Sequence, residues 1–375
     1  MIINNLHFEG IPDAYLIEQC LKKGGLVSSI SKYKLFEHSS YNPVIYIEAC
    51  GANNEKLKFV LRGAPEISGS SQFSSSEALN NELIVMDLLS SIGVEAAKPI
   101  FGGKIMTINY LRANVKNVFK FIPITYVSGL AVDKAFNEQE INYQKYLVQR
   151  IATIYSSVQK IKRNYCGPCI SRDSESGQNC VDFIYAKKEA LIRFLLSCKN
   201  PNVPSKFTND YLRSIDMNRV EILRIFKENP KLNIPSLVLY DGSAGNMLVD
   251  KEKIGLIDFD RALYTCSLVE FCGPLYCLER FFFNSANNNY LWKHFLSTYT
   301  AAGGYLPAEH DLSVLLKDFM IDYLITSAID ALDHKIELKV KAGLAMIEAT
   351  HRLLNLDNFN CMSPIELIRF VKYQH

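Results

Sequence analysis

Apolar and polar residues in the first third of the chain follow patterns that predict one short helix and three strands. Residues 12–23 have the spacing of an amphipathic helix, and Gly24-Gly25 ends it. Extended stretches follow at 26–36 and 44–50, and a third strand is expected at 57–62 after a turn. Strands joined in sequence by turns predict an antiparallel meander.

A second helix is expected from residue 74 to about residue 91. Ser74 and Glu77 have the spacing of a capping box, and apolar residues recur on one face at Leu79, Leu83 and Met86. Further strands are expected at about 100–110 and 118–122. The first part of the chain therefore predicts a small unit of mixed helix and sheet.

The rest of the chain has a mainly helical pattern with one strand-rich interruption. A long helix is expected at 137–162, and residues 181–227 have the pattern of two or three helices broken near two prolines. Short apolar segments then begin at Ser236, Asn246 and Ile254, separated by turns. Helical patterns resume after them and continue almost to the end.

Composition and charge exclude several classes of protein. At 375 residues the chain can form two lobes, and 41 Lys and Arg balance 39 Asp and Glu to a net charge of +2. No block of like charge indicates a nucleic-acid or anionic membrane partner. The N-terminus lacks a secretion signal and no apolar run is long enough to span a membrane, so a cytoplasmic location is expected.

One cysteine pair, Cys166-Gly-Pro-Cys169, has the spacing of a thioredoxin-type redox site. Such a site lies between a strand and a helix, whereas this pair follows a helical pattern and precedes a polar loop. Cys180 and Cys198 do not complete a zinc-binding pattern with it. We expect reduced thiols in a loop.

The strand-rich interruption, residues 239–262, contains the clearest candidate chemistry. Asp241 precedes Asn246 by five residues, and Asp258 follows an apolar segment at the end of a predicted hairpin. This is the order of a kinase catalytic loop and its metal-binding aspartate. Phosphoryl transfer needs a carboxylate to orient and deprotonate a hydroxyl, and hard oxygen ligands for Mg²⁺. Asp241 is therefore the candidate catalytic base, and Asn246 and Asp258 are the candidate metal ligands.

The same stretch resembles the aminoglycoside phosphotransferase and choline kinase superfamily. That family commonly has H-G-D-x-x-x-x-N in the loop, and Ile257 to Ala262 is similar to the I-D-F-D-x-A form of homoserine-kinase-like and fructosamine-kinase-like members. The resemblance implies an α+β, two-lobed protein-kinase-like fold. A small antiparallel-sheet lobe at 1–123 would bind ATP, and a larger, mainly helical lobe at 124–375 would carry catalysis and the acceptor.

The resemblance also implies roles for residues in the small lobe. The segment containing Ser39, Ser40 and Asn42 is similar to the turn that covers the nucleotide. Arg62 resembles the cation at the end of the third strand that contacts phosphates, and Lys58, on the same strand face, is its rival.

Two further pieces of the small lobe follow in the family's order. Glu82 matches the glutamate that pairs with the phosphate-contacting cation, although Glu77 lies one turn earlier. Phe121 lies in a segment similar to the hinge whose backbone groups hold adenine. ATP and Mg²⁺ are the cofactors that the resemblance implies, with a small-molecule hydroxyl as acceptor.

Leu239 and Tyr240 depart from the family pattern, because His and Gly usually stand there and the histidine helps to hold the loop. Two alternatives to a small-molecule kinase therefore stay open: a protein kinase, although no A-P-E element follows, and a pseudokinase that binds nucleotide without turnover. Glu270, Glu279 and Asp322 in the C-terminal helices could meet a cationic acceptor, although solvation is the ordinary role of such acids.

Overall fold

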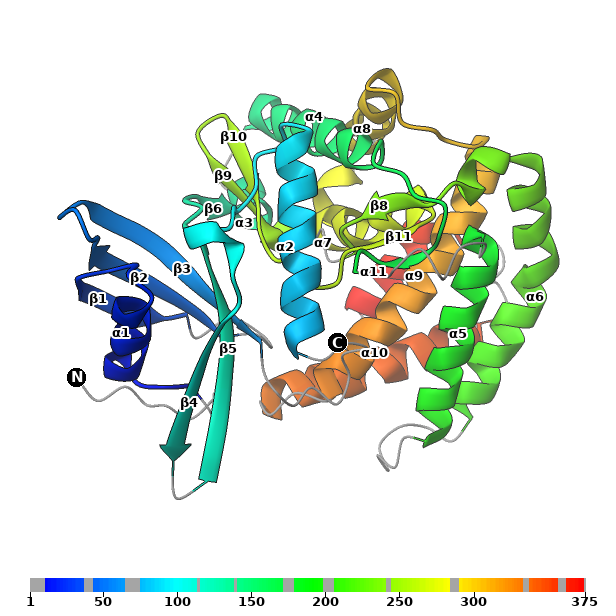
Figure 1. Ribbon diagram of the computed structural model, residues 1–375. Coiled ribbons are helices and arrows are strands. Elements are labelled where there is room, and N and C mark those ends of the chain that lie inside the picture. The colour runs from blue at the N-terminus through cyan, green and yellow to red at the C-terminus, as the bar shows by residue number, and fades with distance from the viewer. Residues whose placement is uncertain are drawn as a thin grey trace. The chain divides into compact units, whose positions relative to one another are not determined.

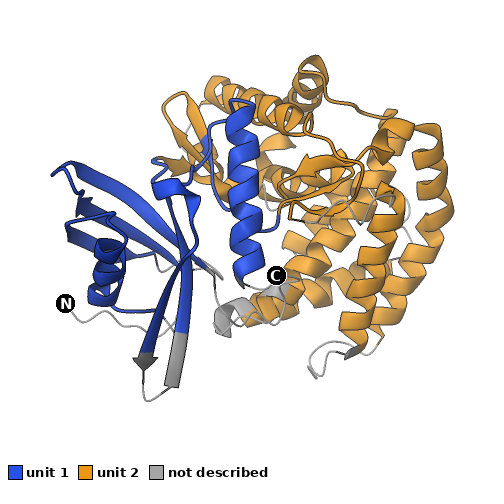
Figure 2. Cartoon of the chain, viewed as in Figure 1, with its two compact units in different colours: residues 1–128, 255–261 blue, residues 129–254, 262–375 orange. Residues whose placement is uncertain are grey.

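The computed structural model describes residues 11–36, 43–64, 75–112, 115–137, 140–170, 179–197, 206–240, 244–283, 290–332, 337–356 and 362–373 (Figure 1). The chain forms two compact units (Figure 2). Unit 1 consists of residues 1–128 and 255–261, and unit 2 consists of residues 129–254 and 262–375. Within the described ranges, no helix is both long enough and apolar enough to cross a bilayer.

Unit 1 is built on a five-stranded antiparallel sheet with the strand order β1-β2-β3-β5-β4. The strands are β1 (Ser29–Leu35), β2 (Val44–Cys50), β3 (Lys56–Ala64), β4 (Met106–Arg112) and β5 (Val115–Thr125). The register of β2 and β3 places Val44 opposite Arg62. The first three strands form the predicted meander, and β2 has the predicted bounds.

Two helices accompany this sheet within unit 1. Helix α1 (Ala14–Lys23) begins after Asp13, whose side chain accepts a hydrogen bond from the backbone N–H of Leu16 at 2.9 Å. Its apolar face packs on sheet residues that include Phe59 and Phe121, both of which are buried. Helix α2 spans Ser75–Ser91. The predicted capping residue, Ser74, lies outside the described residues.

Unit 2 is mainly helical. Its helices are α3 (Val132–Asn137), α4 (Ile141–Val158), α5 (Cys180–Ser197), α6 (Phe207–Glu228), α7 (Cys272–Phe282), α8 (Tyr290–Ala301), α9 (Glu309–Leu332), α10 (Glu337–Leu354) and α11 (Pro364–Tyr373). The helix predicted at 137–162 is present as α4 with narrower bounds. Glu140, which immediately precedes α4, has an extended backbone conformation, and the short helix α3 was not predicted.

Short strands of unit 2 surround the candidate catalytic segment. β8 (Ser236–Val238) and β7 (Gly167–Pro168) flank β11 (Leu263–Thr265), and β6 (Leu130–Ala131) pairs with β9 (Met247–Asp250). Strand β10 (Lys253–Leu256) pairs with β9 and leads the chain into the 255–261 segment of unit 1. The predicted strand-rich interruption is therefore present, and β11 extends it.

Candidate active site

Arg62, near the end of β3, is the centre of a buried charged cluster in unit 1. Its side chain is only 6% exposed, and its guanidinium contacts the carboxylate of Asp258. Arg62 Nε lies 3.4 Å from a carboxylate oxygen of Glu82, and Nη2 lies 3.8 Å from one of Asp260. Lys58 is exposed on the same strand. The structure thus assembles Arg62, Glu82 and Asp258 from three separate parts of the sequence.

Electrostatics fix the protonation of the cation in this cluster. Burial lowers the pKa of Arg62, but Asp258, Glu82 and Asp260 together outweigh it and raise the pKa above its ordinary value. Burial also raises the pKa of Glu82, against the opposing attraction of Arg62. The guanidinium is therefore permanently charged, and Glu82 depends on it as a counter-ion.

The same cluster has the composition of a divalent-cation site. Three carboxylates around one guanidinium leave an excess of negative charge. The side chains of Asp258 and Asp260 remain 28% and 20% exposed, so oxygen atoms can be reached from solvent. Carboxylate oxygens are the ligands that Mg²⁺ prefers. The composition of this cluster therefore fits a magnesium ion.

The backbone of Asp258 adopts a left-handed conformation with φ of +67°. Left-handed geometry costs an L-residue about 1–2 kcal/mol, although aspartate tolerates it better than most. The next residue, Phe259, is fully buried, and its backbone N–H donates a hydrogen bond to Glu82. Surrounding contacts therefore hold the aspartate in this conformation.

In unit 2 a buried acid holds the chain just before the candidate base. The carboxylate of Glu270, at 3% exposure, accepts hydrogen bonds from the backbone N–H groups of Leu239 and, at 3.4 Å, Tyr240. Leu239 is itself buried, and it occupies the position of the family's histidine. Asp241 lies outside the described residues. Glu270 thus anchors the segment whose rigidity the missing histidine puts in question.

Tyr240 carries two further signs of constraint. Its φ is +63°, a conformation rarely adopted by a bulky residue. The ammonium nitrogen of Lys187, on α5, lies 4.0 Å from the centre of its ring, which is a cation–π contact. Glycine adopts this backbone without strain, whereas the side chain of a tyrosine makes it costly. Here the contacts with Glu270 and Lys187 oppose the strain.

Of the other predicted site residues, the structure describes Asn246 and Phe121. Asn246 is the last residue of the short 3₁₀ helix η4 (Ala244–Asn246), whereas Ser39, Ser40 and Asn42 lie outside the described residues. Phe121 is buried in the core of unit 1, and its backbone lies between β3 and β4, opposite Gly63 and Met106.

The chain that follows β5 lies against the strand that leads to Asp258. A Cβ atom on Gly255 would come within 2.5 Å of a methyl group of Val127, so only glycine permits this contact. Tyr126, the preceding residue, is 44% exposed. Residues 126–128 follow the last paired residue of β5, Thr125, whereas Phe121 lies within the paired strand.

The three acids considered for a cationic acceptor are all engaged within unit 2. Glu270 binds the backbone as described above, and buried Glu279 pairs with Arg369 at 2.5 Å. Asp322 accepts hydrogen bonds from Lys188 and from the hydroxyl of Tyr211, each at 2.6 Å. These contacts link helices and loop segments, so the three acids have a structural role within unit 2.

The cysteine pair is not a redox pair in an exposed loop. Cys166 and Cys169 are buried on either side of β7, and the sulfur of Cys166 lies 3.7 Å from that of Cys180. Burial raises the pKa of Cys169 to about 12. The described cysteines of this region are free thiols, as predicted, but they belong to the core.

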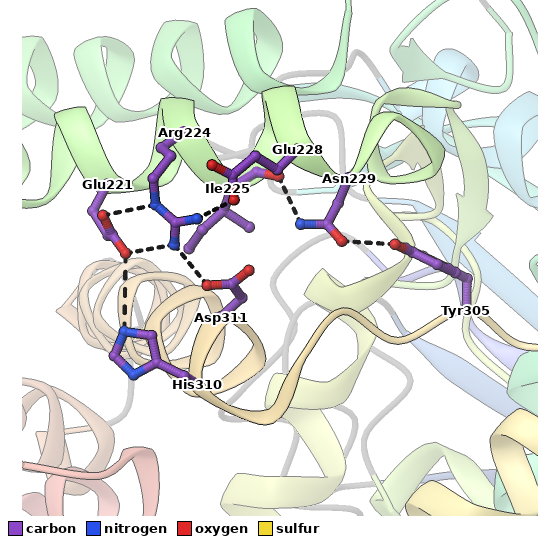
Figure 3. A network of polar contacts seen from close by, with 8 residues as sticks. All are labelled: Glu221, Arg224, Ile225, Glu228, Asn229, Tyr305, His310 and Asp311. Atoms are coloured by element: carbon purple, nitrogen blue, oxygen red, sulfur yellow. Dashed lines mark hydrogen bonds and ion pairs between the residues drawn. The ribbon is translucent and has the colours of Figure 1, made fainter.

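A second charged cluster joins α6 to the start of α9 (Figure 3). Glu221, His310 and Asp311 each offer one potential metal-ligand atom, and these atoms lie within 4.8 Å of one another, a spacing compatible with a metal ion. Arg224 already donates to Glu221 and Asp311, each at 2.7 Å, and also contacts Glu228. The guanidinium supplies the positive charge there, so the cluster is an ion-pair network between helices.

Comparisons with known proteins agree with the predicted fold and family. A model described as "Phosphotransferase enzyme family" matches residues 33–282, from β1 to the end of α7. A search of curated proteins found no match.

Three solved structures illustrate the similarity of fold. An amicoumacin kinase in complex with AMP-PNP, Ca²⁺ and Ami is 16% identical, with 91% of this chain and 94% of that chain covered and a TM-score of 0.56. The aminoglycoside phosphotransferase APH(4)-Ia is 14% identical, with 92% and 100% covered and a TM-score of 0.56. An ethanolamine kinase of Plasmodium vivax is 12% identical, with 88% and 83% covered and a TM-score of 0.53. These findings confirm the predicted superfamily and its α+β, protein-kinase-like fold.

Proposed function

The chain belongs to the phosphotransferase enzyme family, and from this premise we propose that it transfers the γ-phosphate of ATP to a hydroxyl group of a small molecule. The observation that carries the proposal is the contact of Arg62 with both Glu82 and Asp258. It unites a candidate phosphate-binding cation, its glutamate partner and a candidate metal ligand. The names of the similar structures, which include an amicoumacin kinase, an aminoglycoside phosphotransferase and an ethanolamine kinase, favour a small-molecule acceptor.

Asp241 is the proposed catalytic base. It orients the acceptor hydroxyl and accepts its proton as the oxygen bonds to the γ-phosphorus. The bond between that phosphorus and the β,γ-bridging oxygen breaks, which leaves ADP and a phosphate monoester. Glu270 supports this step from a distance, because it holds the backbone of the two preceding residues.

Arg62, Asp258 and Asn246 are proposed to bind the phosphates and the metal. Arg62, oriented by Glu82, would contact phosphate oxygens, while Asn246 and Asp258 offer oxygen ligands to Mg²⁺. When bound, Mg²⁺ supplies positive charge to the phosphate oxygens. We also propose that Ser39, Ser40 and Asn42 cover the phosphates.

Adenine would bind at the end of β5. Tyr126 and Val127 follow the last residue of β5, and Val127 lies against the strand that leads to Asp258. Phe121 supports this site through the sheet core, since its backbone is already positioned between two strands. The proposed adenine contact therefore lies a few residues after the one expected from sequence.

The test measures ATP consumption with Mg²⁺ in the presence of separate acceptors. The panel contains aminoglycosides, choline, ethanolamine, homoserine and a generic protein, and Asp241→Asn serves as the inactive control. We expect at least one small hydroxyl compound to stimulate turnover in the wild type. The Asp241→Asn variant should lose most of this activity, on the order of 100-fold or more, and should still bind ATP.

Two results would contradict the proposal. Transfer of the label to protein but to no small molecule would favour a protein kinase. Equal inactivity of wild type and Asp241→Asn, with ATP still bound, would favour a pseudokinase.

A further inference from the structure

Asn81, on helix α2, is a buried polar residue in contact with the backbone around the candidate metal ligand. Its side chain is fully buried, and its amide nitrogen lies 3.5 Å from the carbonyl oxygen of Phe259 and 3.3 Å from that of Asp260. Both neighbours are acceptors, so the amide presents its two N–H donors to them. One side chain thus reaches two successive peptide groups immediately after Asp258.

Glu82, the next residue on α2, contacts the same segment at the backbone N–H of Phe259. Glu82 accepts a hydrogen bond from the backbone N–H of Phe259, while Asn81 donates to the carbonyl of that residue. Both the N–H and the carbonyl of Phe259 are therefore bound by adjacent side chains of one helix. The conformation of Asp258, with φ of +67°, is set directly next to this doubly held residue.

Neither helix propensity nor packing accounts for an asparagine at position 81. Asparagine is a poor helix former, and an amide is costly to bury. Apart from Glu82, which pairs with Arg62, the other buried positions of α2 are apolar: Leu79, Val85, Met86 and Leu89. The contacts with the two carbonyl groups are thus the reason for a polar side chain here.

We propose that Asn81 is a positioning residue that holds Asp258 in the conformation required to bind Mg²⁺ with the nucleotide. This inference rests on the proposed function. Arg62 and Glu82 bring charge to this segment, whereas Asn81 contacts it through a neutral amide that donates to two backbone carbonyl groups. Groups that orient a metal ligand without touching the metal commonly change metal affinity 10- to 100-fold when they are removed.

The experiment measures binding of the non-hydrolysable nucleotide AMP-PNP by calorimetry over a series of Mg²⁺ concentrations and in EDTA. The variant is Asn81→Ala, and the matched control is Asn80→Ala, the exposed preceding residue of the same helix. For Asn81→Ala we expect the Mg²⁺ concentration at half-saturation to rise at least 10-fold. Nucleotide affinity in EDTA should stay within 2-fold of the wild type. Asn80→Ala should match the wild type in both.

A second variant, Asn81→Ser, keeps one hydroxyl donor and leaves a polar group at this position. It should give a shift between those of the wild type and Asn81→Ala, and its thermal unfolding verifies that the fold is intact. A merely structural role would weaken nucleotide binding equally with and without Mg²⁺, and this result would overturn the inference. So would a folded Asn81→Ala or Asn81→Ser variant with the Mg²⁺ dependence of the wild type.

The wild type separates this failure from failure of the proposed function. If wild-type binding of AMP-PNP does not depend on Mg²⁺, the proposed metal site is wrong and the inference is overturned with it. If the wild type depends on Mg²⁺ and the Asn81 variants do so equally, only the inference is overturned.

Discussion

The carboxylate of Glu270 accepts a hydrogen bond from the backbone N–H of Leu239, the residue that stands where relatives usually have histidine. The donor and the acceptor are both buried. A charged acceptor makes such a bond stronger than one between neutral groups. Glu270 therefore supports, through the backbone, the segment that leads to the candidate base Asp241.

The first prediction concerns Glu270→Gln. The neutral amide accepts more weakly and brings two donors to face backbone N–H groups, so we expect the free energy of unfolding to fall by about 2 kcal/mol. Turnover of ATP should fall about 10-fold, because the segment before Asp241 loosens. The KM for ATP should change less than 2-fold. Steady-state kinetics and urea denaturation measure these effects.

Glu252→Gln is the control for this variant, since Glu252 is exposed in the same unit. It should leave both stability and turnover unchanged. A folded Glu270→Gln variant with wild-type turnover would show that the segment is positioned by other contacts.

The second prediction concerns Arg62. Replacing it with methionine leaves Glu82 buried without its counter-ion, and the loss of one partner of a buried ion pair costs about 3–5 kcal/mol. Arg62→Lys should lower the free energy of unfolding by less, because the positive charge is kept. Some loss should remain, because a single nitrogen cannot reach Glu82 and Asp258 as the fork of a guanidinium does. Chemical denaturation gives the two free energies.

Lys58→Met is the matched control, because Lys58 lies on the same face of β3 but is exposed. We expect a change within about 0.5 kcal/mol. Equal losses in Arg62→Met and Lys58→Met would contradict the assignment of Arg62 as the buried counter-ion.

The third prediction concerns the pH dependence of stability. Burial, and then Asp322, raise the pKa of Tyr211 well above its ordinary value of 10. When the pKa of a group is higher in the folded protein than in the unfolded chain, its stabilising contribution is complete at pH values below the pKa of the unfolded chain. Above about pH 10 the Tyr211 hydroxyl ionises in the unfolded chain before it does so in the folded protein. The free energy of unfolding therefore falls by up to about 1.4 kcal/mol per pH unit.

Tyr211→Phe isolates that contribution, because other titrating groups are common to both proteins. At pH 7 the variant should be less stable by about 2 kcal/mol, since the hydroxyl donates to the charged Asp322. Above pH 10 the difference should shrink. Urea denaturation at several pH values from 7 to 11 measures it, and a difference that stays constant would contradict the assignment.

Much of the fold could be predicted because its local signals were strong. The meander of unit 1 follows from alternating residues and a clear turn, and β2 was predicted at its observed bounds. The missed strand β11 has only three residues, all buried, so no alternation marks it. The short helix α3 was also missed, and α4 was predicted to begin too early, because Glu140 is compatible with a helix and only its extended backbone conformation marks the start of α4.

The candidate site was predictable where a motif marked it. The order of Asp241, Asn246 and Asp258 indicated the chemistry, although the roles of these residues remain predictions. Asn81 and Glu270 gave no such signal. A polar residue on a predicted helix is usually solvated, and only the fold shows that these two are buried against backbone groups far away in the sequence.

The last prediction tests whether Arg224 acts through charge or through packing. Arg224 bridges Glu221 and Asp311 across two helices, but its side chain is 37% exposed (Figure 3), so solvent screens these pairs. Arg224→Met should therefore lower the Tm by a few degrees at most. The difference should largely vanish in 1 M NaCl, where the screening length is about 3 Å. Arg193→Met, whose one ion pair on α5 is more exposed and longer at 3.8 Å, should have almost no effect in either buffer. A loss of Tm for Arg224→Met that persisted in high salt would instead assign its contribution to packing of the aliphatic stem.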